Sequence, residues 1–370
     1  MRVLVTGGAG FIGSHLTDHL LASGHEVRIL DSLDPQVHDG APSYLDPAAE
    51  LVQADVRDHD AVRRALDGVD RVVHLAAAVG VGQSMYEIER YTSVNALGAA
   101  IVLQEIVAAR DRLEKLVIAS SMSIYGEGLY RCPVEGVDVA PRPRPPEQLA
   151  ARDWEPRCPS CGSALEPLPT PESKPLAPTS VYAVGKRDQE ELFLAVGAAY
   201  ALPATALRFF NVYGPRQALS NPYTGVAAIF ASRLLNGRPP IVFEDGRQSR
   251  DFVHVRDVAA VVAQALAPGA ADGEAVNVGS GRAVTVREIA QTLADGLGVH
   301  VEPEIRDEFR AGDIRHCFAD VTRARELLGF SAGISFADGM RELVEWLAGR
   351  EAEDRVAEAT QALASRGLTL

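Results

Sequence analysis

The residues with the clearest capacity for chemistry are a tyrosine and a lysine within Tyr182-Ala183-Val184-Gly185-Lys186. On a helix this spacing places both side chains on one face. A lysine ammonium beside a phenol stabilises the phenolate and lowers the pKa of the tyrosine from about 10 toward neutrality. The pair could therefore act as an acid and a base on a hydroxyl group.

A glycine-rich loop near the N-terminus predicts a dinucleotide site. The apolar run Val3-Leu4-Val5-Thr6 leads into glycines 7, 10 and 13, and Phe11-Ile12 opens an amphipathic pattern after them. Glycine allows a sharp turn, a close approach of the backbone to a pyrophosphate and tight packing of helix on strand. The N-terminus of the new helix offers free amides and a positive dipole end to the phosphates.

The residue at the end of the second predicted strand indicates which dinucleotide binds. Asp31 closes Val27–Asp31, where a carboxylate accepts both hydroxyls of an adenine ribose. It would repel a 2′-phosphate, and no arginine follows it immediately, so we predict NAD rather than NADP. Asp55, after the third strand, suits either a contact to the adenine edge or a strand-end cap. The small residues of Leu75-Ala76-Ala77 would let the cofactor lie against backbone.

These residues need a scaffold, and the alternation of strand and helix patterns supplies it. Parallel strands joined by crossover helices are expected, that is, an α/β fold with a doubly wound Rossmann sheet. We predict strands at 3–6, 27–31, 51–54, 71–75, 115–120 and 204–209, with helices near 11–23, 59–66, 84–109 and 181–200.

The sequence pattern changes after residue 210, and this later part of the chain predicts a smaller mixed α/β region for substrate binding. We place an NAD-binding domain at 1–210, the substrate region at 211–349 and a C-terminal tail at 350–370. Strand segments of the second region could return to the first domain. The tail is expected to be a frayed or loosely docked helix without an assigned function.

A proline-rich segment, about 127–178, is expected to be an irregular excursion from the sheet. Cys158-Pro159-Ser160-Cys161-Gly162 looks like one knuckle of a zinc ribbon, and Cys132-Pro133 like half of another. A closed zinc site needs four ligands, and the segment has three cysteines and no histidine. We therefore expect no metal, with Cys132, Cys158 and Cys161 as the weaker candidate ligand set.

Composition excludes several classes of protein. A formal charge of −14 argues against nucleic-acid binding, which needs a basic face. No apolar stretch near the ~18 residues of a membrane span is apparent, and Met1-Arg2 leads directly into the first strand, which leaves no room for a signal peptide. Four cysteines in 370 residues do not indicate a disulfide-stapled secreted domain. A cytoplasmic protein is expected.

Taken in order, the motifs resemble the NAD-dependent nucleotide-sugar epimerase/dehydratase family of extended short-chain dehydrogenase/reductases. The matching segments are Thr6–Gly13, His74–Ala77, Ser120–Gly126, Tyr182-x-x-x-Lys186, Leu207–Pro215 and Arg250–Val258. The resemblance implies a nucleotide-sugar substrate and three catalytic roles. Tyr182 would be the acid and base, Lys186 would hold the nicotinamide ribose and tune Tyr182, and Ser121 would bond the reacting hydroxyl.

The resemblance also implies two sets of binding residues. The cofactor set is Gly7, Gly10, Phe11, Ile12, Gly13, Asp31, Asp55, Val56, Leu75, Ala76, Ala77, Tyr182, Lys186 and Phe209. The substrate set is Ser121, Ser123, Asn211, Arg250, Arg310 and Asp313. Arginine suits a diphosphate through its fixed fork of donors. For Arg310 and Asp313 a surface ion pair is the alternative interpretation.

Two residues after Ser121 favour epimerisation within this family. Dehydratases and decarboxylases that the sequence resembles carry carboxyl groups there, whereas this chain has Met122 and Ser123. Inversion at C4 of a dTDP- or UDP-hexose, through a transient 4-keto sugar, is therefore predicted. The segments Val79–Tyr86 and Gly312–His316 and the insertion are similar to bacterial dTDP-L-rhamnose 4-epimerases. UDP-glucose/UDP-galactose and UDP-glucuronate 4-epimerases remain alternatives.

Two hypotheses from other classes stay open. A sugar ketoreductase would consume NADH, and a non-catalytic dinucleotide sensor would not need Tyr182 or Lys186, which are both present. The resemblance further implies a homodimer joined through the helices near 84–109 and 181–200.

Overall fold

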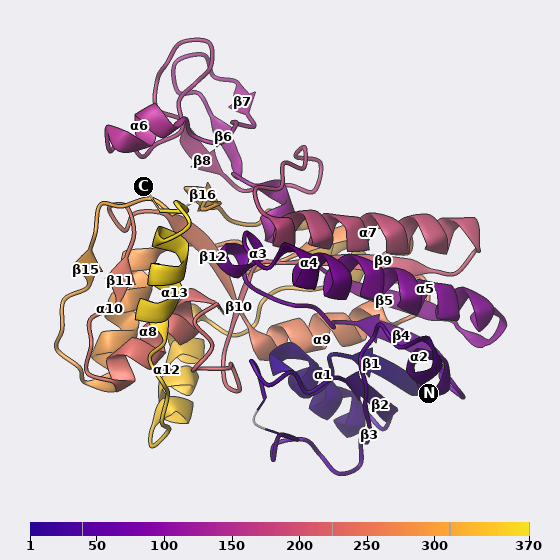
Figure 1. Cartoon of the computed structure of the whole chain (residues 1–370). Coiled ribbons are helices and arrows are strands. Elements are labelled where there is room, and N and C mark those ends of the chain that lie inside the picture. The colour runs from indigo at the N-terminus through magenta and orange to yellow at the C-terminus, as the bar shows by residue number, and fades with distance from the viewer. Residues whose placement is uncertain (39, 224, 311, 370) are drawn as a thin grey trace.

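The computed structural model describes residues 1–38, 40–223, 225–310 and 312–369. Its centre is a seven-stranded parallel sheet (Figure 1). The strands are β1 (Arg2–Thr6), β2 (Glu26–Asp31), β3 (Glu50–Gln53), β4 (Arg71–His74), β5 (Lys115–Ser121), β9 (Ala204–Phe209) and β13 (Ala275–Val278). Their order is β13-β9-β5-β4-β1-β2-β3, which confirms the predicted doubly wound sheet. From β1 the chain adds β2 and β3 on one side and then β4, β5, β9 and β13 on the other. Ligands bind at such a switch point in the strand order.

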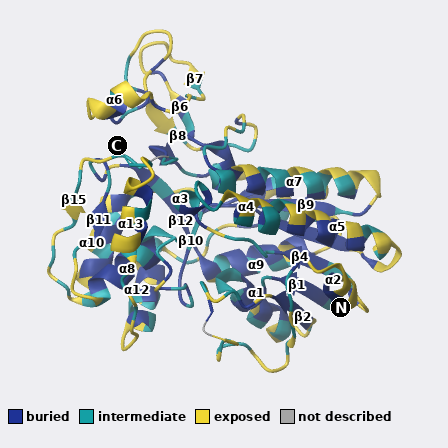
Figure 2. Ribbon diagram, viewed as in Figure 1, coloured by how far each residue is buried: buried dark blue, intermediate teal, exposed yellow. Residues whose placement is uncertain are grey.

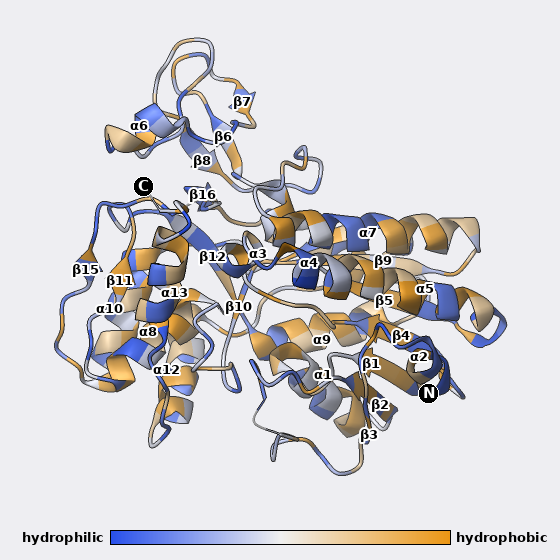
Figure 3. Ribbon diagram, viewed as in Figure 1, coloured by the Kyte–Doolittle hydropathy of each residue, from blue (hydrophilic) through white to orange (hydrophobic). Residues whose placement is uncertain are grey.

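Helices cover both faces of the sheet because its strands are apolar on both sides. Within β1, Val3 and Val5 pack into one buried cluster and Leu4 into another. Figure 3 shows the apolar residues concentrated in these strands and in the helices against them. One cluster includes residues of α1 (Phe11–Ala22), α9 (Val255–Ala265) and α11 (Thr322–Leu328), and the other residues of α2 (His59–Ala65), α5 (Gly98–Ala108) and α7 (Val181–Ala199).

The helix predicted over 84–109 is not one regular helix. It comprises α3 (Val81–Ser84), α4 (Ile88–Tyr91), a π-helix (Thr92–Leu97) and α5. Within the π-helix, the Asn95 side chain accepts a bond from the Ala78 amide at 2.8 Å and donates to its carbonyl at 3.0 Å. Such π turns occur often at functional sites, and this one fixes the loop after β4. A short 3-10 turn, Arg110–Arg112, follows α5.

One helical stretch, Ile88–Ala108, is long and apolar enough to cross a membrane by length and composition. Half of its most apolar window is buried inside the fold. Its segments pack against α2 and α7. A core helix of a folded domain passes the same test, and this contact pattern is that of a core helix.

The second region stands beside the carboxyl end of the main sheet (Figure 1). Two small sheets and four helices build it. They are β10 (Asn211–Tyr213), β12 (Ser249–His254), β14 (Ala283–Thr285) and β16 (His316–Cys317); β11 (Ile241–Val242) and β15 (Glu304–Ile305); and α8 (Val226–Leu235), α10 (Val286–Leu297), α12 (Phe336–Leu347) and α13 (Val356–Ala364). Between these elements, α9 and β13 return to the main domain, where α9 packs on α1 and β13 pairs with β9.

The segment 127–178 is not the irregular excursion that we expected. It forms a three-stranded antiparallel sheet of β6 (Leu129–Arg131), β7 (Asp138–Val139) and β8 (Glu166–Leu168), with α6 (Pro146–Ala150). Figure 1 shows this module projecting from the body, and Figure 2 shows its outer turns as exposed. Strands of two or three residues are too short to produce a periodic signal, which is why the sequence did not reveal them.

The C-terminal tail is docked rather than frayed. Ala359 and Leu363 of α13 are buried. The Arg366 guanidinium lies 4.4 Å from the centre of the Tyr86 ring. The backbones of Arg310 and Thr369 pair in an isolated antiparallel β-bridge. These contacts place the tail against residues of the site described next.

Candidate functional site

The loop between β1 and α1 is shaped for a phosphate group. Gly7 has a φ of +70°, and a side chain there would meet the Ala76 amide nitrogen at 2.8 Å. A Cβ on Gly13 would lie 2.2 Å from the Gly7 carbonyl oxygen. Only hydrogen fits at both positions, so the start of α1 can approach a ligand closely. The glycines are therefore required by the close packing of the backbone at the switch point of the sheet, where they form a cradle for a ligand.

The two predicted adenosine contacts differ in their surroundings. Asp31 is buried at the end of β2, and its carboxylate accepts bonds from the amides of Ala9 at 3.0 Å and Leu33 at 2.9 Å. Asp55 accepts from the Arg57 amide at 2.8 Å and pairs with its guanidinium at 2.6 Å. Arg57 holds the pKa of Asp55 below its ordinary value. Asp55 thus makes the strand-end cap, and its carboxylate still lines the cavity.

One cavity of about 800 Å³ joins the glycine loop to the second region. Every residue predicted to contact cofactor or substrate lines it, although those residues come from both halves of the chain. They are Gly7, Gly10, Phe11, Ile12, Gly13, Asp31, Asp55, Val56, Leu75, Ala76, Ala77, Ser121, Ser123, Tyr182, Lys186, Phe209, Asn211, Arg250, Arg310 and Asp313. Their individual roles remain predictions.

The predicted catalytic side chains meet where β5 and α7 lie side by side. The side chain of Ser180 caps α7 by accepting from the Ala183 amide at 3.1 Å, and Ser84 accepts from the Tyr182 amide at 3.0 Å. Ser121 ends β5, just before the 3-10 turn Met122–Tyr125. Two elements remote in sequence therefore hold the phenol and the hydroxyl in one place.

Burial controls the electrostatics of this pair in the ligand-free chain. It raises the pKa of Tyr182 to about 12, although a hydrogen bond with Ser121 lowers it in part. Burial also lowers the pKa of Lys186 to about 7, and its Nζ donates to the Ala119 carbonyl at 2.8 Å. The expected shift of the Tyr182 pKa toward neutrality is thus not present in this state. Desolvation of the buried phenol is the dominant cause.

The predicted diphosphate residues belong to the second region and line the same cavity. Arg310 and Asp313 do form the ion pair considered as an alternative, at 2.9 Å, and both line the cavity. Arg250 donates to the backbone carbonyls of Arg315 at 2.9 Å and Ile314 at 2.6 Å. The Asn211 Oδ1 atom is buried and has no hydrogen-bond partner among the described residues. An unpaired buried acceptor is costly, and a ligand donor would relieve it.

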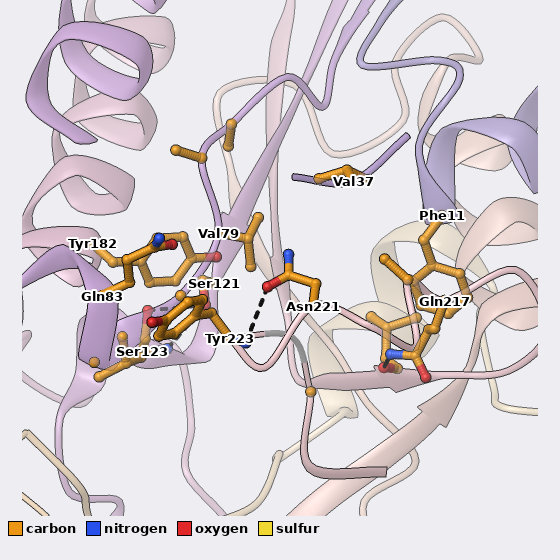
Figure 4. Close-up of a pocket in the computed structure, with 18 of the residues that line it drawn as sticks. Phe11, Val37, Val79, Gln83, Ser121, Ser123, Tyr182, Gln217, Asn221 and Tyr223 are labelled. Carbon is orange, nitrogen blue, oxygen red and sulfur yellow. Dashed lines mark hydrogen bonds between the residues drawn. The ribbon is translucent and has the colours of Figure 1, made fainter. Parts of the chain in front are cut away.

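Several lining residues were missed in the sequence. Figure 4 shows Gln83 and Tyr223 beside Tyr182 and Ser121, with Gln217 on the opposite side of the cavity. Four residues of the tail helix also line it, namely Val356, Ala359, Thr360 and Leu363. The signal available for α13 was a weak apolar periodicity. Such a pattern shows that a helix has a face to bury, but it does not show which surface that face covers.

Comparisons with known proteins agree with this geometry. The family model described as "NAD dependent epimerase/dehydratase family" matches residues 3–147 and 160–279. This chain belongs to that family. It is 37% identical to a dTDP-L-rhamnose 4-epimerase of Burkholderia thailandensis, over 94% of this chain and 95% of that one.

Solved structures show the same architecture. The UDP-glucose 4-epimerase of Thermotoga maritima, with UDP-glucose, has a TM-score of 0.77 and 31% identity, covering 94% of this chain and 98% of that one. The Thermus thermophilus UDP-glucose 4-epimerase, in complex with NAD, has a TM-score of 0.74 and 31% identity, covering 94% and 99%. The cofactor is NAD, as predicted, and the residues fit it. The glycine loop has the close backbone packing that a pyrophosphate site needs, and Asp31 lines the same cavity at the end of β2.

Proposed function

We propose that this protein is an NAD-dependent 4-epimerase of a nucleotide-linked hexose, with dTDP-L-rhamnose as its substrate. The observation that carries the proposal is the pairing of Tyr182 with Ser121 in a cavity that reaches from the glycine loop to Arg250. Met122 and Ser123 follow Ser121, so neither of the next two residues supplies a carboxyl group to assist the loss of water or carbon dioxide. This set of groups can move a proton on and off one hydroxyl group.

The chain's own residues account for the proton transfers. When bound, NAD supplies an acceptor and donor of hydride. Ser121 would hold the 4-hydroxyl group, and Tyr182 would take its proton as the C4 hydrogen passed to the cofactor as hydride, which would leave a 4-keto sugar. Tyr182 would give the proton back to the oxygen once the hydride had returned from the cofactor to the opposite face of C4. Atoms and electrons balance, and only the configuration at C4 has changed.

Inversion requires that the sugar turns while the nucleotide stays in place. Arg250, Arg310 and Asn211 line the cavity and suit an anchor on the diphosphate. A fixed diphosphate keeps the keto sugar at high effective concentration near Tyr182 during the turn.

The substrate is tested with a panel of dTDP- and UDP-sugars, with NMR of the C4 centre. We expect inversion of dTDP-L-rhamnose without net consumption of NAD or NADH. Preferential turnover of UDP-glucose or UDP-glucuronate would move the substrate assignment to those sugars. Elimination products, stoichiometric oxidation of NADH or no turnover of any member would refute epimerisation. The 37% identity to a dTDP-L-rhamnose 4-epimerase over most of both chains supports the first sugar.

We also propose that the enzyme is a cytoplasmic homodimer. Apolar side chains are exposed on the helices predicted for the interface, with Ile88 at 55%, Leu97 at 52% and Val184 at 54% exposure. Burying them in a bundle of four helices would remove this surface from water. Leu97→Glu is expected to give monomers by light scattering after gel filtration, whereas Leu327→Glu, at an exposed position of α11, is not. Dimers of Leu97→Glu would contradict this interface.

A further inference from the structure

The projecting module carries two turns of the same design. Their sequences are Cys132-Pro133-Val134-Glu135-Gly136 and Cys158-Pro159-Ser160-Cys161-Gly162. In each, the final glycine amide donates to the carbonyl of the leading cysteine, at 2.8 Å in the first turn and 2.9 Å in the second. The glycines have φ of +67° and +73°. The turn at residues 132–136 therefore has the same backbone shape as the knuckle at residues 158–162. Glu135 occupies in the first turn the position that Cys161 holds in the second.

The two turns face each other and bring four ligand atoms together. The thiols of Cys132, Cys158 and Cys161 and a carboxylate oxygen of Glu135 all lie within 4.8 Å of one another. The Cys132 and Cys161 sulfurs are 3.5 Å apart, and the Cys158 sulfur is 3.6 Å from Glu135 Oε2. Tetrahedral bonds of about 2.3 Å to sulfur and about 2.1 Å to oxygen place neighbouring ligands about 3.5–3.8 Å apart. The spacing fits an ion at the centre.

The bonds around the cluster fit a knuckle as well. The Glu135 amide donates to the Cys132 sulfur at 3.4 Å. Ser163 Oγ lies 3.1 Å from the Cys161 sulfur and 3.4 Å from that of Cys132. Donors around a thiolate orient it and stabilise its charge.

The module also lacks the core that would hold it together without a metal. Its buried cluster consists of Tyr130, Cys132, Cys158 and Leu165, with Val139 partly buried against it. Two of these four buried residues are cysteines whose sulfurs belong to the group of four ligand atoms. Units this small generally need a disulfide or a metal in place of a large core.

We propose that Cys132, Glu135, Cys158 and Cys161 bind one structural Zn²⁺ ion. Thiolate ligands select zinc over magnesium or calcium. Four protein ligands leave no open position, so the ion would stabilise the fold rather than take part in chemistry. The count of cysteines and histidines missed the site because the fourth ligand is a glutamate.

The position of the module explains why such a brace would matter. Arg144 pairs with Glu244 at 2.7 Å, and Glu155 pairs with Arg315 at 2.6 Å; both arginine side chains are almost fully buried. Arg315 directly follows the segment that carries Arg310 and Asp313 into the cavity. An ordered module therefore supports the substrate-side wall of the site.

Metal content tests the proposal on the full chain. We expect about one equivalent of zinc per chain by mass spectrometry, and all four thiols free after chelation and denaturation. Cys158→Ser is expected to lose the zinc, whereas Cys317→Ser, which changes a buried cysteine outside the cluster, keeps it. Glu135→Gln is expected to release zinc to a chelator about tenfold faster than Glu147→Gln, an exposed glutamate of the same module.

A second measurement covers the case in which Cys158→Ser does not fold. Wild-type protein, depleted of metal and loaded with Co²⁺, is expected to show thiolate-to-cobalt charge transfer and the visible bands of a tetrahedral ion. A cobalt spectrum without thiolate bands would overturn the proposal. So would wild-type protein that neither contains nor takes up zinc under reducing conditions, a disulfide between Cys132 and Cys161, or a Cys158→Ser variant that retains full zinc.

Discussion

Replacing Tyr182 by phenylalanine removes one hydroxyl group and leaves the ring that packs in the site. Tyr182 is the second residue of α7, and its phenol forms a hydrogen bond with the Ser121 side chain. The other hydroxyls cannot replace it, because the Ser123 hydroxyl donates to that of Ser121 at 2.9 Å and neither serine is a base near neutral pH. The proposed mechanism therefore loses the group assigned as its acid and base.

The size of the loss follows from the state of the phenol. With a pKa of about 12 in the ligand-free chain, Tyr182 is ionised in roughly one molecule in 10⁴ at pH 8. Bound ligands must therefore lower this pKa during turnover, and each unit corresponds to about 1.4 kcal/mol. Phenylalanine can exchange no proton, so we expect kcat to fall by about 10³–10⁴, at the upper end for general acid–base catalysis. This fall corresponds to about 4–5.5 kcal/mol of activation free energy.

The assay compares Tyr182→Phe with Tyr200→Phe, which makes the same change at an exposed position just after α7. Initial rates of C4 inversion, the NAD content of the purified protein and thermal unfolding are measured for both. Tyr182→Phe should retain NAD and a near-native unfolding temperature while it loses activity, and Tyr200→Phe should match the wild type. A Tyr182→Phe variant within tenfold of wild-type kcat would refute the assignment of the acid and base.

Three further predictions use other parts of the site. Gly13→Ala should abolish NAD binding, measured by ultraviolet absorption of the purified protein, because the new Cβ would lie 2.2 Å from a carbonyl oxygen; Gly333→Ala, with no atom nearer than 3.6 Å, should retain it. Lys186→Met should stabilise the NAD-free protein by a few kcal/mol at pH 6, and the gain should shrink as the pH rises to 10. The sign follows because burial lowers the folded-state pKa of Lys186 to about 7, below its ordinary 10.5, so stability is lost as the pH falls from 10.5 to about 7 and stays lost below that; urea unfolding at both pH values with no difference in the gain would contradict this. Removal of residues 350–370 should raise the substrate KM about tenfold with a smaller change in kcat, since α13 lines the cavity; an unchanged KM would show that the tail does not contribute to binding.

The main elements could be predicted because their signals are local. The strand β9 was placed at its observed residues, and β2 to within one residue, from apolar runs bounded by turns. The glycine loop and Asp31 could be placed because their roles depend on position within one strand-turn-helix unit. The breaks in the helix over 84–109 could not, because the π turn depends on Asn95 bonding to a loop from elsewhere in the chain.

Residues whose surroundings come from distant segments were predicted less well. The pKa of Tyr182 was expected to fall because Lys186 is a neighbour in sequence, but burial by the assembled cavity reverses the direction. Glu135 has no significance as a ligand until Cys132 and the second knuckle are folded against it. The tail helix was left without a role because periodicity cannot identify the surface that a helix covers.

The sequence by itself determined the doubly wound sheet, NAD as the cofactor and the set of predicted contact residues that the cavity brings together. These features depend on short-range patterns, in which a strand, a turn and the next helix specify one another. Only the tertiary structure decided how the residues act together. It set the protonation of Tyr182 and Lys186, brought the tail to the cavity wall and placed three thiols and a carboxylate within 4.8 Å of one another. Desolvation and ligand geometry depend on atoms that are distant along the chain, and only folding brings these atoms together.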